Sequence, residues 1–281
     1  TDGLSGLESG FTKLDKMTSG WQNSDLIIIA ARPAMGKTAF VLSMAKNIAV
    51  NFRNPVALFS LEMSNVQLVN RLISNVCEIP SEKIKSGQLA DYEWQQLDYK
   101  LRDLLDAPLY VDDTPSLSVF ELRTKARRLV REHGVKVIII DYLQLCDMTT
   151  GQNNRNREQE VAQATRKAKL LAKELNVPVV LLSQLNRESE NRPAGRPELA
   201  HLRESGAIEQ DADVVMLLYR PALARVTTDR ESGYPTEGLG VVIIAKQRNG
   251  ETGNVYFRHN PEMTKITEYV PPLEYMLKHA K

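Results

Sequence analysis

The residues with the clearest chemical potential are Gly36, Lys37 and Thr38, which lie a few residues after a run of apolar residues. A lysine at this position can reach the β- and γ-phosphates of a nucleotide, and a threonine hydroxyl can bind Mg²⁺. Main-chain N–H groups at the start of a following helix would supply further donors to anionic oxygens. The triplet therefore predicts a phosphate-binding loop.

This prediction depends on the segments that flank the triplet. Residues 26–31 are apolar and rich in isoleucine, as expected of a strand covered on both faces. Helical periodicity follows, with apolar residues at Val41, Met44, Ala45, Ile48 and Ala49. We expect the nucleotide to be bound by Ala31, Arg32, Pro33, Ala34, Met35, Gly36, Lys37, Thr38 and Ala39.

The loop departs from the general phosphate-loop pattern, G-x-x-x-x-G-K-S/T. Ala31 stands where that pattern has its first glycine, and Pro33 lacks the main-chain N–H that another residue would supply. A Gly-Lys-Thr triplet is common by chance. The strand before it and the amphipathic helix after it favour the nucleotide-binding interpretation.

Three polar residues follow other apolar segments in the same way. Glu62 comes after residues 56–60, Asp141 ends residues 135–141, and Gln184 follows residues 177–183. Ligands bind at the carboxyl ends of the strands in open parallel sheets. Asp141 is suited to hold Mg²⁺, directly or through water. Gln184 could contact a γ-phosphate or a water, although a simple turn residue is the alternative.

Composition restricts the protein to an ordinary class. The 281 residues are 42% hydrophobic and 25% charged, which predicts one large α/β domain, or one with small appendages. No apolar run is long enough to cross a membrane, and no signal peptide is recognisable. Cys77 and Cys146 lie in apolar sequence, so we expect reduced core residues of a cytoplasmic protein. Four scattered histidines make a zinc site improbable. A net charge of +1 excludes a general positive field as the means of binding nucleic acid.

The remaining pattern predicts alternating strands and helices. Capping boxes at Ser64/Gln67 and Ser118/Glu121 predict two helix starts. The first of these helices has an expected apolar face of Val66, Val69, Leu72, Ile73 and Val76. Residues 81–107 are expected to be helical, with Asp91 as the cap of a helix that runs through Leu105. Residues 149–157 and 186–200 are expected to be mobile loops. Residues 255–257 and 266–269 are expected to form an antiparallel pair. Arg123, Arg127 and Arg131 share a helix face, which is either solvated, a subunit contact or a nucleic-acid surface.

Six strings along the chain carry a resemblance to a known family. They are 30-AARPAMGKT-38, 59-FSLEMS-64, 137-VIIIDYLQ-144, 182-LSQLN-186, 203-RESGAIEQDAD-213 and 245-AKQRNG-250. In this order they resemble the C-terminal motor domain of replicative hexameric DNA helicases of the DnaB type. The Ala-Arg-Pro form of the loop is usual in that family, so Ala31 supports the resemblance.

The resemblance implies a RecA-like P-loop NTPase core: a mostly parallel sheet flanked by helices, with antiparallel strands near the C-terminus. It also implies a homohexameric ring with ATP and Mg²⁺ between neighbouring subunits. In such a ring Lys37 and Thr38 would hold phosphates and Mg²⁺. Glu62 would be the general base, Asp141 would organise Mg²⁺, and Gln184 would sense the γ-phosphate.

The resemblance assigns the remaining site residues to a neighbour's nucleotide and to DNA. Lys246 and Arg248 would act on the nucleotide of the adjoining subunit, Arg248 as an arginine finger. Arg203, with the main-chain N–H groups of Glu204 and Gly206, would hold phosphates of single-stranded DNA in the ring's centre. Contacts to phosphates carry no base information, so binding should be independent of sequence.

Domain organisation follows from the same resemblance. Residues 1–10 are expected to be an arm or linker remnant, and residues 11–281 the motor domain. The family's N-terminal helical domain and linker helix are not recognisable in this chain. Primase and a helicase loader are therefore expected as partners of the full-length protein rather than of this chain alone.

Two other functions fit the phosphate loop. A RecA-type recombinase would share the core and form ATP-gated filaments on DNA, although the Lys246–Gly250 string favours the helicase. A small-molecule kinase would be monomeric, and its activity would not depend on DNA.

Overall fold

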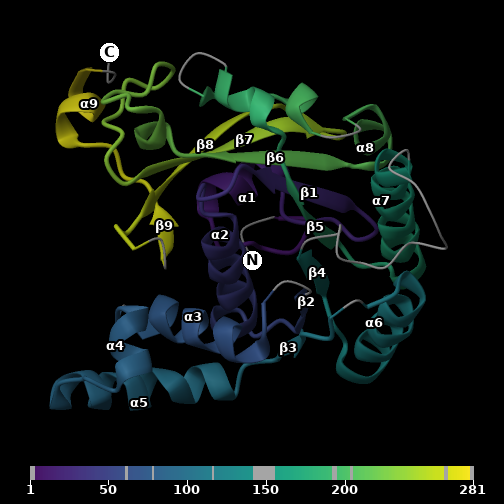
Figure 1. The fold of residues 1–281 in the computed structure, drawn as a ribbon, viewed down its shortest axis with the longest axis horizontal. Helices are drawn as coiled ribbons and strands as arrows, with labels where there is room; N and C mark the ends of the chain where they lie inside the picture. Colours follow the sequence, from purple (N-terminus) through teal and green to yellow (C-terminus); the bar gives the residue numbers. More distant parts are fainter. Residues whose placement is uncertain are drawn as a thin grey trace.

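The computed structural model describes residues 4–60, 63–77, 79–115, 117–141, 156–191, 195–202, 205–262 and 265–278. Within these residues, nine strands form one sheet in the order β3-β2-β4-β5-β1-β6-β7-β8-β9 (Figure 1). The strands are β1 (Leu26–Ala31), β2 (Val56–Ser60), β3 (Leu109–Asp112), β4 (Val137–Asp141), β5 (Val179–Gln184), β6 (Val214–Tyr219), β7 (Leu239–Gln247), β8 (Gly253–His259) and β9 (Ile266–Glu268). Strands β3 to β6 in this order are parallel, and β7, β8 and β9 continue the sheet as antiparallel neighbours.

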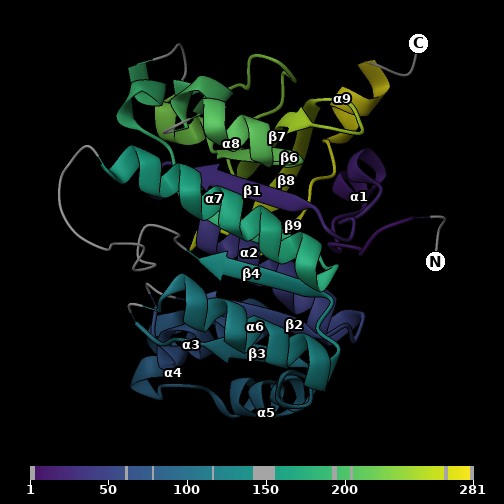
Figure 2. The same cartoon turned by 90° about the vertical axis from the view of Figure 1, so that its right-hand side faces the viewer.

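Helices cover both faces of this sheet. They are α1 (Thr12–Thr18), α2 (Lys37–Lys46), α3 (Asn65–Cys77), α4 (Ser81–Ser86), α5 (Asp91–Leu105), α6 (Val119–His133), α7 (Asn156–Leu175), α8 (Ser205–Asp211) and α9 (Leu273–Lys278). A π-helical turn, η1 (Asn47–Asn51), extends α2, and 3₁₀ turns occur at η3 (Arg187–Asn191), η5 (Leu199–His201) and η6 (Pro221–Ala224). Figure 2 looks onto the face that α6, α7 and α8 cover, and α2 lies on the opposite face.

The central strand β1 shows why both faces must be covered. Its side chains alternate, so that Ile27 and Ile29 pack toward α1 and α2, whereas Leu26 and Ile28 pack toward α7 and α8. Every residue of β1 is buried. Burial on both faces explains the unbroken apolar run in the sequence, and it confirms the predicted α/β class with a mostly parallel sheet.

The segment before α1 is packed against the domain. Leu7 and Trp21 form an isolated antiparallel bridge, and the Trp21 side chain is buried. Ser9 donates its hydroxyl and its main-chain N–H to Asp15 in α1, at 2.6 and 2.9 Å. Burial raises the pKa of Asp15, against the effect of these hydrogen bonds. Residues 4–10 thus contribute contacts to the core of the domain.

The predicted apolar face of α3 is partly wrong. The capping box forms as expected, with Ser64 N–H donating to Gln67 and Gln67 N–H to the Ser64 hydroxyl. Val66, however, is 70% exposed, and Leu68 and Leu72 are the residues that pack into the main core. Asn75 is also buried, because it donates to the Ser43 hydroxyl of α2 at 2.8 Å. Leu72 of the predicted face is buried, and Ile73 and Val76 pack against the cluster of Cys77, Ile79 and Leu97, so the error lies at Val66 and Val69.

Three boundaries also differ from the sequence prediction. The expected helical region 81–107 contains α4 and α5, separated by residues 87–90. Helix α5 ends at Leu105 as predicted, but Ala90 rather than Asp91 occupies its cap position. Helix α7 begins at Asn156, within the expected loop 149–157; the part before Asn156 lies outside the described residues. The expected loop 186–200 contains η3 and the start of η5.

The arginine face of α6 has an intramolecular partner. Arg123 and Arg127 both donate to Glu174 on α7, and these hydrogen bonds, that of Arg123 first, lower the pKa of the glutamate. Arg131 lies beside Glu132, with 4.0 Å between charged atoms. Two of the three arginines are therefore used to join two helices.

Phe40 of α2 provides a test of the core on the α2 face. It is 1% exposed, stacks on Phe11 at 5.1 Å between ring centroids and contacts Phe257 of β8. We expect Phe40→Ala to lower the free energy of unfolding by about 3–5 kcal/mol, measured by urea denaturation. The matched control Phe120→Ala, at a side chain that is 76% exposed, should change it by less than about 0.5 kcal/mol. Equal midpoints for the two variants would contradict this packing.

Candidate functional site

The predicted phosphate loop joins β1 to α2 in the required geometry. Gly36 has a φ of 87° and ends the loop, and α2 begins at Lys37. This left-handed conformation is readily accessible to glycine, which explains the residue type at this position. The first N–H groups of a helix lack partners within the helix, so those of α2 are available to an anion.

Two predicted residues from β5 and α2 lie beside this loop. Lys37 Nζ donates to the main-chain oxygen of Ser183 at 3.1 Å, which places the ammonium next to the end of β5. Gln184 pairs in register with Ala31, the last residue of β1. The loop lysine and the glutamine therefore share the edge where the parallel strands end, which we call the carboxyl edge.

Asp141 lies at the same edge. It ends β4, pairs in register with Ser60 and is 5% exposed. Strand β5 separates β4 from β1, so Asp141 lies two strands from the loop. This edge thus gathers a lysine, a hydroxyl, a carboxylate and a helix N-terminus. Together these groups could bind the phosphates of a nucleoside triphosphate and a divalent cation. Glu62, two residues after Ser60, lies outside the described residues.

Two arginines hold the loop from outside. Arg32 donates to Glu190 and to the main-chain oxygen of Leu185, each at 3.0 Å, so its side chain contacts the segment after β5. Arg220, directly after β6, donates to the main-chain oxygen of Ala34 at 2.8 Å. Ala34 has a φ of 67°, in the left-handed region that is unfavourable for alanine. The Arg220 contact therefore stabilises a strained turn of the loop.

Lys246 and Arg248 lie at the opposite edge of the sheet. Strand β7 is antiparallel to β6, so its end lies beside the beginning of β6: Lys246 pairs with Val215 and Gln247 with Val214. Strand β1 starts at this same amino edge and ends at the phosphate loop. Its six residues span roughly 17 Å at the usual rise of a strand. The two cations are thus separated from their own chain's loop by the length of the central strands.

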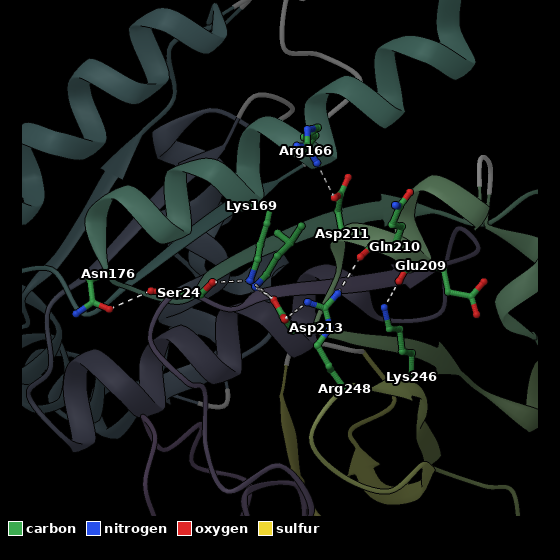
Figure 3. A network of polar contacts seen from close by, with 11 residues as sticks. Ser24, Arg166, Lys169, Asn176, Glu209, Gln210, Asp211, Asp213, Lys246 and Arg248 are labelled. Atoms are coloured by element: carbon green, nitrogen blue, oxygen red, sulfur yellow. Dashed lines mark hydrogen bonds and ion pairs between the residues drawn. The ribbon is translucent and has the colours of Figure 1, made fainter.

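Polar contacts fix both cations at the amino edge, as Figure 3 shows. Lys246 Nζ donates to the main-chain oxygen of Glu209, and Arg248 Nη2 donates to that of Gln210 at 2.8 Å. Both acceptors lie in the last turn of α8, whose carbonyl groups carry partial negative charge. Arg248 Nη1 also lies 3.2 Å from Asp213 Oδ1.

The string predicted to bind DNA leads into the same helix. Arg203 and Glu204 lie outside the described residues, and Gly206 lies in the first turn of α8, where it is exposed. Helix α8 therefore has a predicted DNA contact at its beginning and contacts with Lys246 and Arg248 at its end. Its seven residues correspond to about 10 Å.

Comparison with known proteins identifies the family. A family model described as the DnaB-like helicase C-terminal domain matches residues 6–268. The chain belongs to this family. It is 45% identical over 263 residues to "Replicative DNA helicase DnaB" of Geobacillus stearothermophilus, covering 94% of this chain and 56% of that protein. It is 44% identical over 263 residues to "Replicative DNA helicase DnaC" of Bacillus subtilis (strain 168), with the same two coverages.

Solved structures agree with the assignment to the DnaB-like family. One solved ATPase domain has a TM-score of 0.86 and 36% identity, over 96% of this chain and 94% of that one. "The Structure Of A DnaB-Like Replicative Helicase And Its Interactions With Primase" has a TM-score of 0.85 and 36% identity, over 95% of this chain and 62% of that one. The RecA-like core predicted from the sequence is confirmed. The chain spans about half the length of the curated relatives it matches.

Two features are absent from the part of this DnaB-like chain that the structure describes. No helix there is long and apolar enough to cross a bilayer. No group of three or more histidine, cysteine, aspartate or glutamate side chains there forms a metal cluster. Cys77 is a buried free thiol, as predicted, whereas Cys146 lies outside the described residues.

Sequence reasoning missed Arg220 and Asp213. Arg220 carried a usable signal, since it directly follows an apolar strand, much as Gln184 ends one. Asp213 stands just before β6 and gave no such signal. It is 4% exposed and is joined to Lys169, Arg248 and the N–H of Leu26. Only tertiary contacts between distant segments reveal its role.

Electrostatics at the amino edge are dominated by burial. Burial raises the pKa of Asp25 to about 6; the charge of Asp213 adds to this, and Lys169 and Arg248 oppose it. Burial also lowers the pKa of Lys246, as does the neighbouring Arg248, to a smaller extent. The cluster therefore holds its charges close together in a partly desolvated setting, where they interact more strongly than in water.

Asp25 makes protein stability depend on pH in a defined direction. The pKa of Asp25 in the folded protein is about 6, above its usual value of 3.8. The stability that this group contributes is therefore fully present below pH 3.8, and it is lost as the pH rises through about 6. The Asp25→Asn variant does not lose this stability, because asparagine does not ionise. The melting temperature of the variant, minus that of the parent, should rise between pH 5 and 6.5 and then stay constant to pH 8. A difference that is independent of pH over this range would contradict the shift.

Proposed function

We propose that this chain is the motor domain of an ATP-driven, homohexameric replicative DNA helicase that moves along single-stranded DNA. The observation that carries the proposal is the separation of the nucleotide machinery onto two edges of one sheet. The phosphate loop lies at the carboxyl edge, and Lys246 and Arg248 lie at the amino edge. A complete site would then need the carboxyl edge of one copy and the amino edge of the next.

The residues at the carboxyl edge would bind the nucleotide within one subunit. Lys37 and the N-terminus of α2 would hold the phosphates of ATP, and Thr38 and Asp141 would hold Mg²⁺. Bound Mg²⁺ would neutralise charge that develops on the phosphates. Gln184, level with the loop, would contact the γ-phosphate, and Glu62 would orient the attacking water.

The residues at the amino edge would complete the neighbour's site. An arginine finger supplied in trans increases the rate of phosphoryl transfer by about 10³–10⁵. Head-to-tail contacts between identical subunits close into a ring when the rotation between them allows it. In such a ring each subunit would use its own loop and its neighbour's Lys246 and Arg248, so hydrolysis would depend on subunit position.

Single-stranded DNA would be held by Arg203, Glu204 and Gly206. Support comes from α8, because Gly206 lies at its beginning and its last turn accepts hydrogen bonds from Lys246 and Arg248. A helix that contacts both groups could convert movement at the neighbour's nucleotide into movement of the DNA contact. Phosphate contacts alone would let the motor run on any sequence.

The printed names of the relatives extend the proposal to the full-length protein. Two matched relatives are named replicative DNA helicases, and one matched structure concerns a DnaB-like helicase and its interactions with primase. We propose the same role for the longer protein, working at the fork in the cytoplasm with primase and a loader. Family membership favours this function over a recombinase or a small-molecule kinase. A recombinase would exchange strands without displacing one from a forked duplex.

Mixed rings of the natural full-length protein test the division between edges. Lys37→Ala and Arg248→Ala should each lower ATP turnover by about 10³ or more, because each removes one half of every site. Arg248→Ala should still bind an ATP analogue. An equimolar mixture should regain about a quarter of the parent rate, because one interface in four pairs an intact loop with an intact finger.

Two results would contradict the proposal that Arg248 acts on the neighbouring subunit. If the mixture stays as inactive as its components while differently tagged subunits co-purify in one ring, the two residues act in the same subunit. A strictly monomeric protein that hydrolyses ATP at full rate would lead to the same conclusion.

Arg203→Ala tests the DNA contact. Loss of one phosphate contact per subunit should weaken binding of oligonucleotides and lower the magnitude of the slope of log K against log salt by about 1 for each subunit that contacts the strand. Fluorescence anisotropy with dT and mixed-sequence oligonucleotides should show the same loss for both. The matched control Arg128→Ala, on the exposed surface of α6, should leave binding unchanged. A loss confined to one sequence would contradict a phosphate contact.

A further inference from the structure

Asp213 is a buried carboxylate with several contacts that the proposed chemistry does not explain. Its Oδ2 accepts the N–H of Leu26 at 2.8 Å and lies 2.7 Å from Lys169 Nζ. Its Oδ1 lies 3.2 Å from Arg248 Nη1, and its main-chain oxygen accepts the Arg248 N–H at 2.9 Å. Asp213 therefore contacts Arg248 through both its main chain and its side chain, as Figure 3 shows for the side chain.

These contacts leave the guanidinium of Arg248 usable. Arginine has five N–H donors, and the hydrogen bond to Gln210 uses one of them, while the contact with Asp213 is an ion pair. The Arg248 side chain is 44% exposed. The guanidinium can thus be held by Asp213 on its buried side and still present N–H donors to a phosphate on a neighbouring subunit.

Lys169 pairs with the Asp213 carboxylate. Burying a carboxylate is costly unless it is paired and hydrogen-bonded, and Lys169, itself only 13% exposed, supplies a second cation. Lys169 is fixed in turn by a bond to the main-chain oxygen of Ser24 at 2.8 Å. The carboxylate is thereby anchored to α7 and to the start of β1, two rigid elements, rather than to a loop.

We propose that Asp213 is a positioning residue for Arg248, orienting the guanidinium for use on the neighbouring subunit's nucleotide. This inference rests on the proposed function. Without the carboxylate, a long and partly exposed side chain would sample many rotamers, and ordering it at each turnover would reduce the rate. Asp211 is the natural comparison: it lies two residues away, but pairs with Arg166 on α7 instead of Arg248.

Asp213→Asn in the natural full-length protein is the central test. Asparagine keeps an oxygen for the Leu26 N–H and removes the charge that attracts Arg248. We expect ATP turnover to fall by about tenfold to a hundredfold, since a misplacement of about 1 Å can cost that much. The affinity for an ATP analogue should change little, because the phosphate loop lies at the other edge. Asp211→Asn should keep the parent turnover.

Complementation separates positioning from general damage. Equimolar Asp213→Asn and Lys37→Ala should regain about a quarter of the parent turnover, since some interfaces pair an intact loop with an oriented Arg248. Asp213→Asn mixed with Arg248→Ala should regain none of it, because both subunits then lack a working finger. A carboxylate that only supported the fold of its own subunit would not give the recovery with Lys37→Ala, because the damaged subunit would then lack a working phosphate loop as well.

Each outcome has a distinct meaning. If Arg248→Ala complements Lys37→Ala but Asp213→Asn does not, the proposed function holds and the role of Asp213 is wrong. If neither pair recovers, action in trans fails, and the positioning role fails with it. Should Asp213→Asn not fold, Asp213→Glu keeps the charge and displaces it by one methylene. That variant should also lose turnover and be complemented by Lys37→Ala; a loss without complementation overturns the inference.

Discussion

Two buried parallel strands, β1 and β6, determine what this protein can do with a nucleotide. They are hydrogen-bonded to each other and covered on both faces, so their ends are fixed at a constant separation. Strand β1 starts at the Asp213 cluster and ends at the phosphate loop, and β6 starts at Asp213 and ends at Arg220, which contacts that loop. The two polar sites of the domain are therefore rigidly joined and cannot approach one another.

Charge is distributed accordingly. At the carboxyl edge, Arg32 and Arg220 hold the loop through main-chain oxygens and a glutamate, which leaves Lys37 beside the end of β5. At the amino edge, Asp213 stands between two cations in a partly desolvated cluster. Both sites use buried or half-buried polar contacts to order groups before a ligand arrives. In a DnaB-like ring, this would reduce the reorganisation needed when a neighbour's nucleotide binds.

Helix α8 connects the amino edge to the string proposed to bind DNA. Its last turn accepts hydrogen bonds from Lys246 and Arg248, and its first turn contains Gly206. A short helix transmits displacement along its axis because its main-chain hydrogen bonds resist compression. The proposed link between hydrolysis and DNA movement therefore requires only two turns of helix.

Local patterns in the chain predicted most of the individual elements and the placement of Lys37, Asp141 and Gln184 at one edge of the sheet. The apolar run of β1, the glycine before Lys37 and the aspartate at the end of β4 are short-range patterns whose geometry follows from neighbouring residues. Patterning failed in part of α3, where Val66 is exposed, Leu68 is buried, and the buried Asn75 donates to Ser43. The folded chain was needed to place Arg248 opposite its own loop and to set Asp213 beside it. Local periodicity does not depend on the direction in which β7 runs or on which segments about 40 residues apart pair with each other. No local pattern in the chain could therefore reveal these contacts.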